Sequence, residues 1–232
     1  MARRSAYRYA AGPDAPEMLF EAITERASGS MLDLGCGPGE LGQRVRTTLG
    51  NDVVGVDISP RMVRLATERG VPALVCDAQS LPFKNDLFDL VAAAWVLYHV
   101  QDVDKALSEI RRVLRPNGCL IAVTNCPDHL GEARALAGIA ATDGGSFSSQ
   151  DAPEMLRRHF ADVEVRDASG TIDFPDRESI ASFIHSWQTF RGVLTLPDDI
   201  TFPFVVQRRT VILVARAPEG CIYSVLPGDQ AS

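Results

Sequence analysis

The sequence predicts an α/β fold in which a doubly wound, parallel sheet is covered by helices on both faces. From residue 14 onward, short and nearly continuous apolar runs alternate with segments of helical periodicity, as expected for strands buried on both faces. A glycine-rich turn joins the first of these runs to a helix. The 232 residues, 46% of them hydrophobic, suffice for one large core and show no internal repeat.

The first half of the chain should alternate helix and strand. Asp14 can cap a first helix, and Ser59 followed by Pro60 is typical of a helix start. The helices expected here cover residues 16–27, a segment from Glu40, a segment from Ser59 and residues 102–114. The strands expected here cover residues 31–34, 53–56, 73–76, 87–94 and 119–124.

The second half is less regular. We expect a helix over residues 130–141, a Gly-Ser loop over 144–149, a helix over 152–160, a strand over 163–167 and a last strand over 211–215. The stretch 171–202 is rich in aromatic residues and has no clear period.

The composition of the chain disfavours some classes of binding partner. The formal net charge of −7 would repel a phosphate backbone, so nucleic acid is a disfavoured partner. The five cysteines have no C-x-x-C spacing, which indicates reduced thiols and no metal site. No apolar leader follows the basic N-terminus and no stretch reaches about 18 uncharged apolar residues, so we expect a cytoplasmic protein without a membrane span.

The most informative segment is the loop Asp33-Leu34-Gly35-Cys36-Gly37-Pro38-Gly39-Glu40 between a strand and a helix. Glycines let the backbone approach a ligand, and the free N–H groups of a helix start attract anions, so a nucleotide-like ligand is expected. Gly37, Gly39 and Gly42 also satisfy the G-x-G-x-x-G pattern, with Asp57 at the spacing of an NAD site. On this motif alone, NAD and a ligand-free turn both remain open.

Further motifs follow in order: Gly55-Val56-Asp57-Ile58-Ser59, Cys76-Asp77-Ala78, Leu81-Pro82-Phe83, Phe88-Asp89-Leu90-Val91 and Val113-Leu114-Arg115-Pro116-Asn117-Gly118. Together with the glycine loop, their order and spacing resemble the class I S-adenosylmethionine-dependent methyltransferase family. The resemblance is close over residues 30–125 and looser over 211–215. It implies a Rossmann-like sheet of seven strands with the last antiparallel, S-adenosylmethionine as cofactor and S-adenosylhomocysteine as product.

The resemblance also implies a domain plan and a set of cofactor contacts. One methyltransferase domain would cover residues 1–218, with inserts over the substrate at about 126–150 and 171–202 and a tail at 219–232. The glycines would line the methionine and ribose, Asp33 the ammonium, and Asp57 the ribose hydroxyls. The cofactor contacts expected from the loop and the strand after it are Asp33, Gly35, Cys36, Gly37, Gly39 and Asp57. Ile58 and Met62 would lie on the adenine face, Asp77 and Ala78 on the adenine edge, and Ala94 and Trp95 beside the sulfonium.

His99 follows the fourth strand, where it is a candidate general base because its unperturbed pKa lies near neutral pH. A structural role in its loop is the alternative. This strand is not followed by the D/N-P-P-Y/W/F element with which relatives hold a nucleobase or glutamine amide nitrogen, so the resemblance implies that such acceptors are disfavoured. Tyr98 beside His99 is a candidate acceptor-binding residue. Further candidates in the variable segments, each with an ordinary structural role as its alternative, are Tyr7, Tyr9, His129, His185 and Trp187.

The leading hypothesis is methyl transfer to an oxygen, nitrogen or carbon atom of a small molecule, in specialised or quinone-type metabolism. The acidic surface and an insert large enough to enclose a small molecule favour it. A tRNA wobble-uridine methyltransferase, a cofactor-binding module without chemistry and an NAD-dependent reductase are the alternatives.

Overall fold

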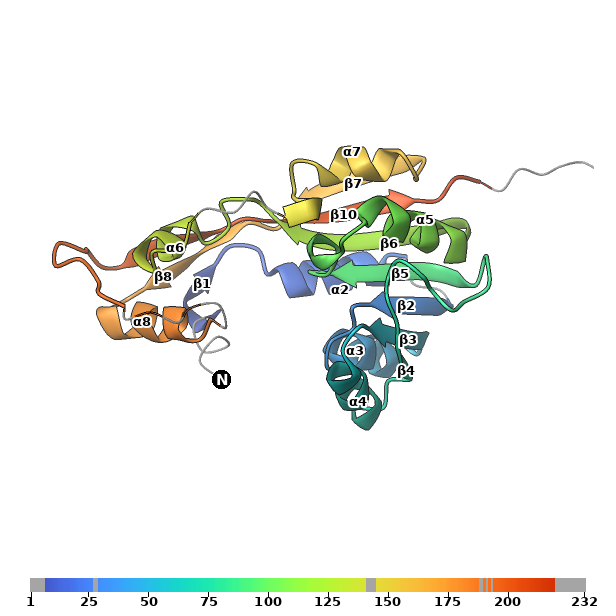
Figure 1. Cartoon of the computed structure of the whole chain (residues 1–232), viewed down its shortest axis with the longest axis horizontal. Helices are drawn as coiled ribbons and strands as arrows, with labels where there is room; N and C mark the ends of the chain where they lie inside the picture. The colour runs from blue at the N-terminus through green and yellow to red at the C-terminus, as the bar shows by residue number, and fades with distance from the viewer. Residues whose placement is uncertain are drawn as a thin grey trace, which may run out of the picture.

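The computed structural model describes residues 7–26, 29–140, 145–187, 190, 192 and 194–219. Within these residues the chain forms a large seven-stranded sheet and a small three-stranded sheet. The small sheet and its helices lie beyond one end of the large sheet's strands, which gives the molecule an elongated outline (Figure 1).

The large sheet has the strand order β4-β3-β2-β5-β6-β10-β7. Every adjacent pair is parallel except the two that involve β10, which runs antiparallel to β6 and β7. This confirms the doubly wound, mostly parallel sheet with an antiparallel last strand. The strands are β2 (Ser30–Leu34), β3 (Asp52–Asp57), β4 (Ala73–Val75), β5 (Phe88–Ala94), β6 (Leu114–Asn125), β7 (Asp162–Asp167) and β10 (Thr210–Arg216).

Helices cover both faces of this sheet, and each face has its own buried core. On one face pack α5 (Val103–Val113) and α7 (Ala152–Arg157). On the other pack α2 (Ala15–Thr24), α3 (Glu40–Leu49) and α4 (Pro60–Glu68). The central strands are mostly apolar because both of their faces are buried.

The small sheet was not expected from the sequence. It pairs β1 (Ala10–Ala11), β8 (Gly170–Phe174) and β9 (Phe204–Arg208), all antiparallel. The helices α6 (Gly131–Leu136) and α8 (Arg177–His185) pack on it around a third hydrophobic core. We call β1, α6, β8, α8 and β9 the cap.

Strand β6 shows which end of the large sheet faces the cap. It runs parallel to β5, ends at Asn125 and is followed along the chain by α6. The carboxyl ends of the parallel strands therefore point toward the cap, as the ribbon also shows (Figure 1). Ligands of doubly wound sheets bind at this edge.

Some expected boundaries were wrong. The helix expected over 130–141 covers only six residues, because Leu130 and Gly138 both adopt positive φ and the Ile139 N–H bonds back to the Arg134 carbonyl. The helix expected over 152–160 ends at Arg157, and a short 3-10 turn, Gly145–Phe147, lies in the expected Gly-Ser loop. Most of the expected tail, residues 220–232, lies outside the described residues.

Candidate functional site

The glycine loop turns sharply between β2 and α3. Gly35, Gly37 and Gly39 all have positive φ, at 69°, 51° and 81°, a region that favours glycine. Their surroundings differ. A Cβ on Gly35 would lie 2.4 Å from Cγ2 of Val96, whereas a Cβ on Gly37 would meet nothing within 4 Å. The loop is therefore packed against the segment after β5 at Gly35 and open at Gly37.

Asp57 ends β3 beside this loop. Its Oδ2 accepts a hydrogen bond from the Gly37 N–H at 2.9 Å, and its Oδ1 accepts one from the Ser59 N–H at 2.8 Å. The sequence spacing of the loop and the acidic residue is thus matched by direct contact. A carboxylate offers about four lone-pair positions, so these two bonds leave acceptor capacity on both oxygens.

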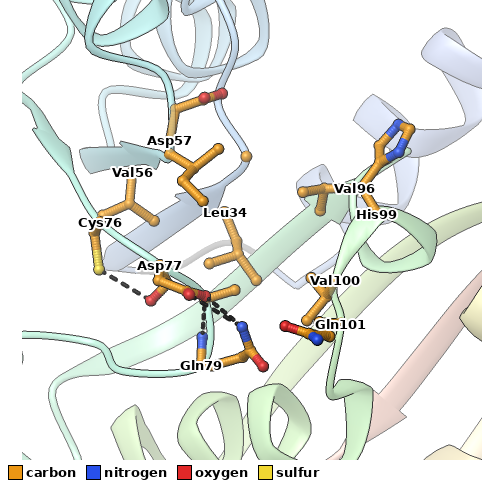
Figure 2. A pocket seen from close by; sticks show the side chains of 13 residues that line it. Leu34, Val56, Asp57, Cys76, Asp77, Gln79, Val96, His99, Val100 and Gln101 are labelled. Carbon is orange, nitrogen blue, oxygen red and sulfur yellow. Dashed lines mark hydrogen bonds between the residues drawn. The ribbon is translucent and has the colours of Figure 1, made fainter.

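A pocket of about 240 Å³ opens at the carboxyl ends of β2, β3, β4 and β5. Six of the residues expected in the site line it, namely Gly35, Asp57, Ile58, Asp77, Ala78 and His99. Its other lining residues are Leu34, Val56, Cys76, Gln79, Val96, Val100 and Gln101 (Figure 2). Ile58 is 73% exposed at this pocket, a large apolar surface that a ligand could cover.

Asp77 lies on the other side of the pocket from Asp57 (Figure 2). Its Oδ1 accepts from the Gln79 backbone N–H at 2.9 Å, and both of its oxygens are 3.0 Å from the Gln79 side-chain Nε2. Bonds from the Gln79 backbone and side chain hold the pKa of Asp77 below its usual range. Asp77 is therefore an anion at neutral pH.

Asp33 is buried beneath the glycine loop, at 2% exposure, and does not line the pocket. Its Oδ2 has no hydrogen-bond partner among the described residues. Burial, followed by the nearby Asp57 charge, raises the pKa of Asp33 to about 7, against the lowering effect of the Gly42 N–H. The contact with a methionine ammonium stays a prediction.

The other expected cofactor contacts lie outside the lining of this pocket. Cys36 is buried against Gly55, and burial raises its pKa to about 12. Gly39 packs on Ala66, and Met62 is half-buried in α4. Ala94 ends β5, and Trp95 follows it with a φ of +54° and packs on the core beneath α2. Their cofactor roles also stay predictions.

Tyr98 and His99 lie on a 3-10 turn, Leu97–His99, after β5. Their ring centroids are 4.4 Å apart, and only His99 lines the pocket. The backbone of Gly145 packs on Tyr98, since a Cβ there would lie 3.2 Å from the Tyr98 carbonyl oxygen. Tyr98 is therefore covered by the chain that follows α6.

The remaining acceptor-site candidates lie in or beside the cap, away from the pocket lining. Tyr9 packs on Phe174 and Trp187 on Phe183, with ring centroids 6.4 and 5.4 Å apart, and Tyr7 is 41% exposed. His129 Nδ1 lies 3.0 Å from the Arg209 backbone N, and His185 Nδ1 2.8 Å from the Ala181 carbonyl oxygen. Their roles toward an acceptor stay predictions.

Seven lining residues were not among the predicted site residues: Leu34, Val56, Cys76, Gln79, Val96, Val100 and Gln101. The available signal was their position, since each lies in the last two residues of a motif strand or within seven residues after it. In the part of the chain that the structure describes, no helix is long and apolar enough to cross a membrane. Among the same residues, no three His, Cys, Asp or Glu side chains gather as metal ligands.

The segment that forms the pocket is similar to known proteins. Residues 32–122, which contain the glycine loop and all of the residues that line the pocket, match the family model described as "Methyltransferase domain". This segment is therefore similar to a methyltransferase domain. The fold of the chain is shared with the YcgJ protein from Bacillus subtilis, with a TM-score of 0.62 and 21% identity over 88% of this chain and 99% of that one.

Part of this chain is also similar to curated proteins. The ubiquinone/menaquinone biosynthesis C-methyltransferase UbiE of Burkholderia mallei is 38% identical over 40% of this chain and 42% of its own length. The human mitochondrial arginine-hydroxylase NDUFAF5 is 33% identical over 53% of this chain and 36% of its own length. The match therefore spans less than half of each relative, and their names show that similar domains occur in proteins named for different reactions.

Proposed function

We propose that this chain binds S-adenosylmethionine in the described pocket and transfers its methyl group to a small-molecule acceptor. The observation that supports this most is the pairing of Asp57 and Asp77 across one pocket, at the ends of neighbouring strands β3 and β4. Two carboxylates flanking an exposed aliphatic side chain suit a nucleoside with hydroxyls at one end and an amine at the other.

Four of the lining residues contact the cofactor in this proposal. Asp57 accepts the ribose hydroxyls with the lone pairs that Gly37 and Ser59 leave open. Ile58 packs on the adenine face, which would cover its 73% exposed surface. Asp77 accepts from the adenine amine, and the Ala78 N–H donates to a ring nitrogen.

S-adenosylmethionine supplies a methyl group on a sulfonium, and an oxygen, nitrogen or carbon nucleophile takes it. The chain's part is to hold the acceptor in line with that methyl group and to exclude water. His99 is exposed at the pocket and is the proposed base for an acceptor that must lose a proton. An acceptor that is already nucleophilic would not need this proton transfer.

The acceptor would lie between the pocket and the cap. The relative named as a ubiquinone/menaquinone C-methyltransferase supports an acceptor of quinone type. The formal charge of −7 supports a small molecule rather than a nucleic acid. The acceptor atom is left to experiment.

Calorimetric titration of S-adenosylmethionine, S-adenosylhomocysteine and NAD tests the cofactor. The first two should bind, and Asp57→Ala should weaken both about 100-fold, because two charge-assisted hydrogen bonds are lost. Asp52→Ala is the matched control, at the opposite end of the same strand and outside the pocket. Binding of NAD alone, or of none of the three, would refute the proposal.

A screen of acceptors with mass-spectrometric detection then tests the reaction. A product heavier by one methylene unit supports methyl transfer. Tight binding of S-adenosylhomocysteine with no turnover over a broad panel would instead favour a cofactor-binding module. Retention of tRNA at low salt would favour the tRNA alternative.

A further inference from the structure

Gln79 joins two parts of the pocket that are distant in the sequence. Its Nε2 is 3.0 Å from both carboxylate oxygens of Asp77, and its Oε1 accepts from the Asp102 backbone N–H at 3.1 Å. A carboxylate can only accept and a backbone N–H can only donate, so these partners fix the orientation of the amide.

The contact with Asp77 restrains the carboxylate. Asp77 is on the solvent side of the pocket, where an unsupported side chain would rotate between conformers. Three hydrogen bonds from Gln79 hold it in a single orientation: Oδ1 accepts from the backbone N–H and from Nε2, and Oδ2 accepts from the same Nε2 (Figure 2). The remaining lone pairs are thereby directed away from Gln79.

The contact with Asp102 reaches the segment that bears His99. Asp102 caps α5, since its Oδ1 accepts from the Lys105 N–H at 3.0 Å. It directly follows Val100 and Gln101, which line the same pocket. One side chain therefore spans from the turn after β4 to the turn after β5.

We propose that Gln79 is a positioning residue that makes the pocket selective for a 6-aminopurine nucleoside over a 6-oxopurine nucleoside. Gln79 acts through Asp77: a fixed carboxylate accepts from an amine and repels the carbonyl oxygen of an oxopurine. This rests on the proposed function, because it assigns the base specificity of the same cofactor pocket.

The test compares S-adenosylhomocysteine with S-inosylhomocysteine, which carries an oxygen in place of the amine, by calorimetry. The wild type should prefer the adenosine compound, and Gln79→Met should reduce the ratio of the two dissociation constants about fivefold. Methionine keeps the length of glutamine without its donor or acceptor. Gln79→Ala is the second variant should the methionine variant unfold.

Two further variants separate positioning from packing. Asp77→Ala should lower the ratio on its own, and adding Gln79→Met to it should change the ratio no further, because Gln79 acts through Asp77. Gln150→Met is the matched control, an exposed glutamine outside the pocket lining that should keep the wild-type ratio. Thermal unfolding of each variant without ligand shows that the fold is intact.

Each outcome decides the matter. An unchanged ratio in Gln79→Met, or a further fall when it is added to Asp77→Ala, overturns the inference while leaving the cofactor proposal in place. A wild type that binds S-adenosylhomocysteine but does not discriminate between the two bases also overturns it. A wild type that binds neither compound refutes the cofactor proposal and the inference with it.

Discussion

At the scale of single residues, the three loop glycines share a backbone conformation but differ in space. Gly37 has open surroundings, whereas a Cβ on Gly39 would lie 2.9 Å from Cα and Cβ of Ala66. Gly39 is thus needed for the close approach of α3 to α4. Gly37 is free to face a ligand.

We expect Gly37→Ala to lower the free energy of unfolding by about 1 kcal/mol, the cost of the left-handed conformation alone. Gly39→Ala should cost about 2–4 kcal/mol, because the clash with Ala66 adds to that strain. Urea unfolding followed by circular dichroism measures both. Equal losses in the two variants would contradict this difference.

Asp33 should make the free energy of unfolding depend on pH. Its pKa is about 7 in the fold and 3.8 when exposed, so the folded state binds the proton more tightly. The contribution of Asp33 to stability is therefore greatest at low pH and is lost as the pH rises from about 4 to about 7.

Compared with Asp33→Asn, which cannot ionise, the wild type should lose about 1 kcal/mol of stability per pH unit over that range. The measurement is the difference in unfolding free energy between the two proteins at about pH 5, 6 and 7. Taking the difference cancels the other titrating groups. A difference that stays constant over this pH range would contradict the raised pKa of Asp33.

The candidate site illustrates what sequence predicts at this scale. Asp57, Ile58 and Asp77 could be placed in one pocket, because each ends a strand of a parallel sheet or follows it within two residues. The place of Trp95 could not, since its positive φ turns the chain just after β5 and no residue pattern encodes that turn.

At the scale of elements, the cap depends on one buried cation. Arg208 is 5% exposed in β9, and it donates to the carbonyls of Thr171, Ala11 and Pro13 at 3.2, 3.1 and 3.1 Å. It therefore links β9, β8 and the segment that contains β1. These bonds compensate for the burial of the charge.

Arg208→Met should cost about 2–3 kcal/mol and speed amide exchange in β1, because three carbonyls lose a charged donor. Arg209→Met, at the neighbouring position, is the matched control. Its ion pair with Asp128 joins side chains that are 49% and 60% exposed, so less than about 1 kcal/mol should be lost. Chemical unfolding with hydrogen exchange tests both, and similar effects in the two variants would refute the role of Arg208.

The strands of the large sheet were predictable, and those of the cap were not. Buried parallel strands leave continuous apolar runs such as Leu90–Ala94, whereas β1 has two residues and β9 alternates Val205 outward with Val206 inward over only five. Short strands carry too few residues for a period to be recognised.

At the scale of the whole molecule, the cap core is separate from the two cores of the large sheet. Phe183 is 1% exposed within it, and Ile121 is fully buried in a core of the large sheet. Such an arrangement allows the cap to open without unfolding of the large sheet.

We therefore expect Phe183→Ala, at a cost of about 3–5 kcal/mol, to speed amide exchange in β8 and α8 while β2 and β6 stay protected. Ile121→Ala should instead speed exchange in the large sheet. Hydrogen exchange with mass spectrometry resolves these segments. Uniform loss of protection from either variant would show that the three cores unfold as one.

The sequence by itself determined the doubly wound sheet, the glycine loop and the acidic residues that follow it. These depend on local periodicity and on short motifs at strand ends, which neighbouring residues encode. The tertiary structure decided the cap sheet and the partners across the pocket: Val96 against Gly35, Gln79 between Asp77 and Asp102, and Arg208 on Ala11, which is 197 residues away. Such contacts join residues that are distant along the chain, and no period or local spacing records which of them will meet.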